Sequence, residues 1–123
     1  MPLVSVLMPS YNRSALIKEA IESVLNSGNS SFELIIVDDA STDDTVAIAQ
    51  ACAAKYDRIK VFVNEKNIGD YANRNRAASY ATGKYLKYVD FDDRLLKGGL
   101  QYCVACMEQN AKADWAMIYE HGK

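Results

Sequence analysis

Three carboxylates stand close together in the segment Asp90-Phe91-Asp92-Asp93, directly after an apolar, tyrosine-rich stretch. Neighbouring carboxylates repel one another, and this repulsion costs free energy unless a cation neutralises them. Mg²⁺ and Mn²⁺ accept one or two carboxylates and leave their other coordination positions to water and phosphate oxygens. The segment therefore predicts a site for a divalent metal and a phosphate-bearing ligand. Taken alone, it also fits a solvated acidic turn that caps a helix.

Two other polar segments carry residue types that suit nucleotide binding. Tyr11, in the segment 9–13, offers an aromatic face for stacking on a nucleobase, or it anchors its own loop. In Asp38-Asp39 a carboxylate can accept a hydrogen bond from a base or a ribose, although the pair also suits a plain turn and helix cap. Three cations can contact diphosphate oxygens or stay solvated: Lys66, Arg74 and Arg76.

Apolar segments with two different periods alternate along the chain, which indicates that strands alternate with helices. Short apolar runs predict strands at residues 3–8, 32–37, 59–63, 85–89 and 115–119. Apolar residues at helical spacing predict helices over about 16–25, 46–53, 71–81 and 100–107. Pro9 is expected to end the first strand, because proline has no N–H for the ladder. The expected helix caps are Asn12 or Ser14 for the first helix and Ser41 or Thr42 for the second.

This order of elements predicts an α/β fold, namely a three-layer α/β/α sandwich with an open, mostly parallel sheet. We expect a single domain over residues 1–123. In such sheets ligands bind beyond the carboxyl ends of the strands, where connections diverge to opposite faces. The segments 9–13, 38–42 and 90–94 each follow a predicted strand, so they should lie at one edge and converge on one ligand.

The composition argues against several kinds of partner. Fourteen basic and sixteen acidic side chains give a net charge of −2, which predicts no attraction to nucleic acid. No apolar run approaches the roughly 20 residues of a membrane span, and the first residues do not resemble a signal peptide. We therefore expect a cytoplasmic location. A full-length protein could also associate with the inner face of the membrane. The cysteines are expected to be reduced thiols.

Four segments, in order, resemble motifs of the inverting family 2 glycosyltransferases, which have the GT-A fold. Residues 4–12 resemble that family's opening strand and loop, and residues 33–43 its second strand and acidic turn. Residues 67–76 resemble its Asn-x-Gly and Ala-Arg-Asn region, and residues 83–93 the strand that bears its D-x-D motif. Asn73 stands where the family often has alanine, and we expect this difference to have little effect.

The resemblance implies a role for each matching residue. Pro9 and Tyr11 would line the base pocket, and Asp39 would contact the nucleobase. Arg74 would belong to the same nucleotide-sugar site. Asp90 would face the ribose or the sugar, and Asp92, together with Asp90, would bind the metal.

The family's activity is the transfer of a sugar from a nucleotide-diphosphate sugar, most often a UDP-sugar, to a sugar or lipid-linked acceptor. Such a reaction implies a Mn²⁺ or Mg²⁺ cofactor that stabilises the leaving diphosphate, and a carboxylate base that deprotonates the acceptor hydroxyl. In this family the acceptor side and the base lie well beyond residue 123. We therefore expect this chain to supply the donor-binding half, truncated before the acceptor half, and to contain no catalytic base.

Two alternatives from other classes remain open at this point. A receiver-like signalling domain also gathers an acidic pair and a metal at one edge of a parallel sheet. Its acidic pair follows the first strand, however, where this chain has Pro9-Ser10-Tyr11. A non-catalytic nucleotide-sugar binding module would carry the same donor motifs without transferring a sugar.

Overall fold

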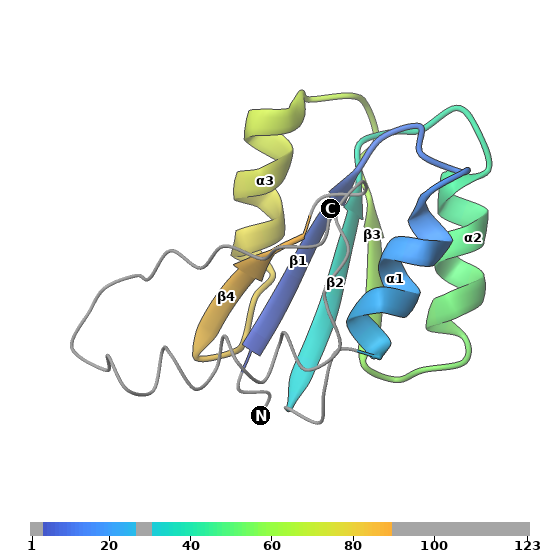
Figure 1. Cartoon of the computed structure of the whole chain (residues 1–123). Helices are drawn as coiled ribbons and strands as arrows, with labels where there is room; N and C mark the ends of the chain where they lie inside the picture. Colours follow the sequence, from blue (N-terminus) through green and yellow to red (C-terminus); the bar gives the residue numbers. More distant parts are fainter. Residues whose placement is uncertain (1–3, 27–30, 90–123) are drawn as a thin grey trace, which may run out of the picture.

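The computed structural model describes residues 4–26 and 31–89, and within them a sheet of four strands forms the centre (Figure 1). The strands are β1 (Val4–Ser10), β2 (Phe32–Asp38), β3 (Ile59–Val63) and β4 (Tyr85–Tyr88). All neighbouring strands are parallel, in the order β3-β2-β1-β4. The helix and strand expected at 100–107 and 115–119 lie outside the described residues.

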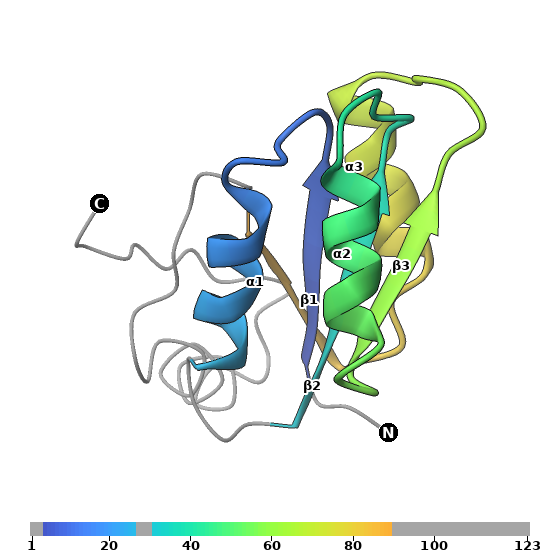
Figure 2. The same ribbon diagram turned by 90° about the vertical axis from the view of Figure 1, so that its right-hand side faces the viewer.

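Three helices cover the sheet, namely α1 (Ile17–Leu25), α2 (Thr45–Ala53) and α3 (Asp70–Ser79). Helices α1 and α2 lie on one face and α3 on the other, as the two perpendicular views show (Figures 1 and 2). The connections through α1 and α2 carry the chain from β1 to β3 in one direction, whereas α3 returns it to β4 on the far side of β1. The expected three-layer α/β/α sandwich with a parallel sheet is confirmed.

Alternation along the central strands explains why both faces are covered. Val6 and Met8 of β1 pack with Ile21 of α1, whereas Leu7 between them packs with Ala77 of α3. These side chains are fully buried. Successive side chains of a strand point to opposite faces, so a strand that is buried at every position needs a helix on each side.

The prediction that Pro9 ends the first strand is wrong, because β1 continues to Ser10 and Pro9 pairs with Val37 of β2. The hydrogen bonds explain why. The carbonyl of Ser10 accepts from the N–H of Asp39 beyond β2, and the carbonyl of Leu7 accepts from the N–H of Val89 beyond β4. Backbone groups alternate in direction along a strand, so the missing N–H of Pro9 would point toward β4, and the ladder with β2 does not need it.

The expected helix caps are also wrong. Leu16 precedes α1 and Asp44 precedes α2, and neither caps its helix through a side-chain hydrogen bond. The polar residues that were expected to cap helices bond between two loops instead, as described below. Capping by a neighbouring side chain competes with such longer-range bonds, and the packing of the loops decides between them.

A buried carboxylate joins the strands at the amino end of the sheet. Glu33 is 3% exposed and accepts hydrogen bonds from the hydroxyl of Ser5 at 2.6 Å and from the N–H of Thr82 at 2.8 Å. It also forms an ion pair with Lys60 at 3.0 Å. Burial by itself raises the pKa of Glu33, but the bonds from Ser5, Thr82 and Lys60 outweigh it and lower this pKa to about 2. Gly83 allows the close approach here, since a Cβ on it would lie 2.8 Å from the backbone nitrogen of Ser5.

Candidate functional site

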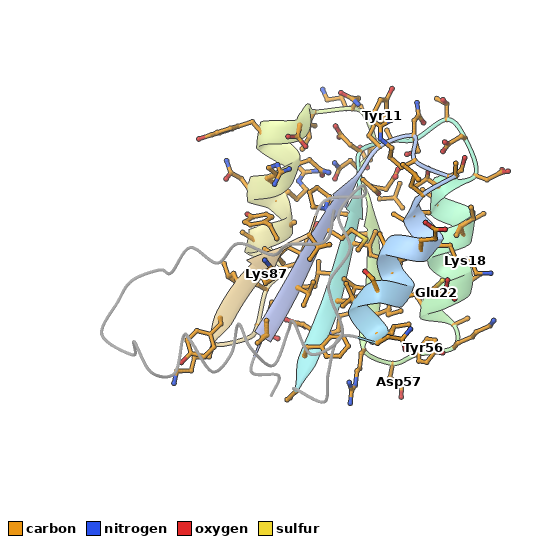
Figure 3. The ribbon with its side chains drawn as sticks, viewed as in Figure 1. Tyr11, Lys18, Glu22, Tyr56, Asp57 and Lys87 are labelled. Atoms are coloured by element: carbon orange, nitrogen blue, oxygen red, sulfur yellow. The ribbon has the colours of Figure 1, made fainter. Side chains whose placement is uncertain are left out.

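A cleft of about 450 Å³ lies at the carboxyl end of the sheet, within the size range of small-molecule sites. The end of β1 contributes Pro9 and Tyr11, the end of β2 contributes Asp39, and α3 contributes Asn73 and Arg74. Figure 3 shows Tyr11 beyond the carboxyl end of β1. Four residues that the sequence singled out from separate segments therefore line one cleft: Pro9, Tyr11, Asp39 and Arg74.

Asp39 is the most deeply buried charged group of this cleft, with 2% of its surface exposed. Its Oδ1 accepts from Asn64 Nδ2 at 2.9 Å and from the N–H of Ile68 at 2.8 Å, and its Oδ2 accepts from the N–H of Gly69 at 2.9 Å. These donors offset the cost of burying a carboxylate. Each carboxylate oxygen has two acceptor sites, so Oδ2 keeps capacity for a further donor from a ligand.

The segment 67–69 wraps around Asp39. Asn67 Nδ2 donates to the Asp39 carbonyl at 3.2 Å, and Gly69 turns its N–H to the carboxylate just before α3 begins. The φ of Gly69 is 93°, a backbone conformation that side-chain-bearing residues rarely adopt. The family-like Asn-x-Gly motif thus has a physical purpose here, which is to hold the acidic turn.

Asp38 takes the other role that the sequence left open for the acidic pair. Its carboxylate accepts from the hydroxyl of Ser10 at 3.0 Å, and from the N–H and hydroxyl of Ser41 at 2.7 and 2.6 Å. These are the bonds of a turn. Of the two neighbouring acidic residues, Asp38 therefore shapes the loop and Asp39 faces the cleft.

The loop that carries Tyr11 is bonded to the loop after β2. Asn12 has a φ of 50°, its N–H donates to Ser41 Oγ at 2.8 Å, and its Oδ1 accepts from the N–H of Thr42 at 2.8 Å. Asparagine adopts this left-handed conformation more readily than most residues. Tyr11 itself is 43% exposed beside the cleft, so its ring is open to a ligand.

The three predicted cations separate in space. Arg74 lines the cleft, donates from Nε to Asp70 at 3.0 Å and places its guanidinium 5.5 Å from the centre of the Tyr88 ring. Lys66 and Arg76 line a different hollow of about 380 Å³ beside β3. Arg74 is therefore the one of the three that the cleft can offer to an anionic ligand.

Asn64 and Asn73 are residues of the site that sequence reasoning missed. Both are buried, and Asn64 Nδ2 donates to Asp39 Oδ1 and to Asn73 Oδ1, each at 2.9 Å. Little effect is expected from the asparagine at 73, but its side chain belongs to the network behind Asp39. A polar amide within an alanine-rich helix was the available signal.

The predicted metal ligands, Asp90 and Asp92, lie outside the described residues. Val89, the last described residue before them, is buried, and its N–H donates to the carbonyl of Leu7 at 2.9 Å. Leu7 belongs to β1, the strand that ends at the cleft. Within residues 4–26 and 31–89 there is no group of three or more His, Cys, Asp or Glu side chains placed to hold a metal ion.

The described helices are all too short or too polar to cross a membrane.

A parallel sheet whose strand order reverses direction next to β1, with a cleft beyond the carboxyl ends, is the arrangement of nucleotide-binding α/β proteins. Comparison with known families makes this class specific. The model of Glycosyl transferase family 2 matches residues 5–123, and the chain belongs to this family.

Two of the curated relatives are named as glycosyltransferases. A GalNAc(5)-diNAcBac-PP-undecaprenol beta-1,3-glucosyltransferase of Campylobacter jejuni is 35% identical over 120 residues, covering 97% of this chain and 38% of that protein. An uncharacterized glycosyltransferase of Rickettsia felis is 40% identical over 124 residues, covering 98% of this chain and 20% of that protein. The chain thus spans well under half the length of these relatives.

Solved structures share the fold. Staphylococcus aureus TarS 1–349 in complex with UDP-GlcNAc superposes with a TM-score of 0.81 at 32% identity, over 88% of this chain and 32% of that one. The mannosyltransferase PcManGT of Pyrobaculum calidifontis, in complex with GDP-Man and Mn²⁺, superposes with a TM-score of 0.79 at 25% identity, over 86% of this chain and 32% of that one.

Proposed function

We propose that this chain is the donor-binding part of an inverting glycosyltransferase that transfers a sugar from a nucleotide-diphosphate sugar to an acceptor hydroxyl. The observation that carries the proposal is that Pro9, Tyr11, Asp39 and Arg74 all line the same cleft. An aromatic face, a buried acceptor and a cation are the three groups that a base, its ring N–H and a diphosphate require.

The nucleobase end of the ligand lies against Asp39 and Tyr11 in this proposal. An ionised carboxylate only accepts hydrogen bonds, so Asp39 favours a base that offers a ring N–H. Uracil and guanine have one, whereas the corresponding ring nitrogen of cytosine is itself an acceptor. The ligands of the structural neighbours, UDP-GlcNAc and GDP-Man, both fit this rule. A UDP-sugar is our proposed donor.

The diphosphate end lies toward Arg74 and the acidic segment that follows β4. Asp92, with Asp90, would hold Mn²⁺ or Mg²⁺, since carboxylates are hard oxygen donors that suit either ion. The bound ion would neutralise charge on the departing nucleoside diphosphate. The Mn²⁺ in the PcManGT complex supports the choice of metal. Arg74 adds a positive charge to the same leaving group.

The acceptor and the base are proposed to belong to sequence beyond this donor-binding part. The relatives are more than twice as long as the chain, and one of them is named for an undecaprenol-linked acceptor. We propose a sugar or lipid-linked hydroxyl as acceptor, which would bring the whole protein to the inner membrane face. A carboxylate near that acceptor would take its proton as it attacks the anomeric carbon.

Calorimetric titration with UDP and Mn²⁺ tests the donor site. The unmodified protein should bind UDP only when the metal is present, and the Asp92→Asn variant should bind at least about 10-fold more weakly. Undetectable binding, or affinity unchanged by the substitution, would show that the site is assigned wrongly.

A non-catalytic binding module is the competing function. Release of UDP from a UDP-sugar that increases with added acceptor would exclude it. Tight UDP binding without acceptor-dependent release, for any acceptor in a panel of lipid-linked sugars, would favour it.

A further inference from the structure

Two buried side-chain amides connect Asp39 to the sheet and to α3. Asn64 Nδ2 donates to both Asp39 Oδ1 and Asn73 Oδ1, and Asn73 Nδ2 donates to the carbonyl of Val37 at the end of β2, all at 2.9 Å. Asn64 Oδ1 accepts from Arg76 at 3.0 Å. The two amides are 5% and 2% exposed, so water does not compete for these bonds.

This network leaves little freedom to either amide. Both hydrogens of the Asn64 amide are used, one on Asp39 and one on Asn73, and its oxygen is used by Arg76. Asn73 is tied in turn to the backbone of β2. A fully satisfied buried polar network fixes the orientation of its members more strictly than apolar packing does.

The orientation of the Asp39 carboxylate follows from these ties. Oδ1 receives two protein donors, from Asn64 and Ile68, whereas Oδ2 receives one, from Gly69. The terminal torsion of aspartate is broad and nearly two-fold, so the carboxylate rotates unless its oxygens are held. Without Asn64, each oxygen would keep one backbone N–H, from Ile68 or Gly69, so the carboxylate would be held less firmly.

We propose that Asn64 and Asn73 are positioning residues that aim Asp39 Oδ2 at the nucleobase and thereby set the preference for bases with a ring N–H. This inference rests on the proposed function. Asn64 does not line the cleft and acts through Asp39, whereas Asn73 both supports Asn64 and lines the cleft. The proposed function assigns the diphosphate and metal contacts to other side chains, so these contacts should not depend on the amides.

The test compares UDP with CDP, each titrated in the presence of Mn²⁺ into the whole protein and its variants. CDP has the same diphosphate and ribose but lacks the ring N–H. Asn64→Ala should weaken UDP binding about 10-fold and Asn73→Ala about 3-fold, while CDP affinity changes by less than about 2-fold. Gln50→Ala removes an exposed amide of α2 and should leave both affinities unchanged.

Asn73→Ala guards against a variant that fails to fold, because alanine is the best helix former and fits this helical position. Loss of UDP over CDP preference in a variant with cooperative thermal unfolding supports the inference. Equal weakening of both ligands, or no weakening in either variant, overturns it and leaves the proposed function standing. An unmodified protein that does not bind UDP overturns the proposed function as well.

Discussion

Two buried carboxylates at opposite ends of the same sheet have different surroundings. Glu33, at the amino end, is enclosed by Ser5, Thr82 and the cation Lys60. Asp39, at the carboxyl end, accepts from an amide and two backbone N–H groups, all neutral, and lines a cleft. A buried carboxylate that has a cationic partner is already neutralised by the protein itself. One held by neutral donors at a cleft can take another donor from a ligand.

Both carboxylates are almost fully buried, yet we expect Glu33 to contribute to stability and Asp39 to ligand binding. Burial alone would have marked both as structural or both as functional. The space beside each carboxylate distinguishes them. At the amino end the backbone of Gly83 packs closely against Ser5, whereas at the carboxyl end a Cβ built on Gly69 would have no atom within 4 Å. Changes at Glu33 should therefore affect folding, and changes at Asp39 should affect ligand binding.

The largest expected effect is that of Glu33→Ala. It leaves the buried hydroxyl of Ser5 and two donors of the exposed Thr82 without their acceptor, which should lower the free energy of unfolding by roughly 2–4 kcal/mol. Urea denaturation followed by circular dichroism measures this loss. A loss below about 1 kcal/mol would mean that the amino-end carboxylate is not the structural one.

Acid should remove the contribution of Glu33 in a defined range. Its pKa is lowered from 4.5 to about 2 in the fold, so its stabilisation is fully present above about pH 4.5 and is lost as the pH falls through about 2. The unfolding free energies of the native protein and Glu33→Gln should differ by roughly 2–3 kcal/mol at pH 7 and converge at the acid end.

Glu33→Gln is the necessary control for this pH profile, because a second carboxylate titrates in the same range. The Thr45 hydroxyl bond is the main reason why the pKa of the exposed Asp43 is also lowered to about 2. Asp43 is present in both proteins, so it cancels in the difference. A difference that stays constant with pH would exclude Glu33 as its source.

Substitution of the two glycines by alanine should have the smallest effects on stability, and the two variants should differ in ligand binding. Gly83→Ala should lower the unfolding free energy by roughly 1–3 kcal/mol, because its Cβ meets the backbone at Ser5. Gly69→Ala meets no atom but strains a φ of 93°, at a cost of about 1 kcal/mol or more. Because the Gly69 N–H holds Asp39, its variant should also weaken UDP binding, and the Gly83 variant should not. Thermal unfolding and calorimetry on both variants distinguish these outcomes.

The fold was predictable because its signal is local. Nearly continuous apolar runs such as residues 32–37 identify strands covered on both faces, and the structure places β2 within one residue of that range. The ends of elements were less predictable. Pro9 stays in β1 because its missing N–H faces the β4 side, and that direction depends on the register of the whole sheet.

The cleft was predictable in part. Pro9, Tyr11 and Asp39 follow the ends of strands, and parallel strands bring such residues to one edge whatever the details of packing. Asn64 and Asn73 could not be assigned this way. Their bonds exist only because the end of β3 and the face of α3 meet behind Asp39, which is a property of the packed structure.

The most direct test of the donor-site assignment is the affinity for UDP with Mn²⁺ of Asp39→Asn beside that of Glu33→Gln. Each substitution removes one buried negative charge at constant size, at opposite ends of the sheet. We predict about a 30-fold weaker affinity for Asp39→Asn and an unchanged affinity for folded Glu33→Gln. Equal affinities in the two variants would contradict the assignment of the cleft as the nucleotide site.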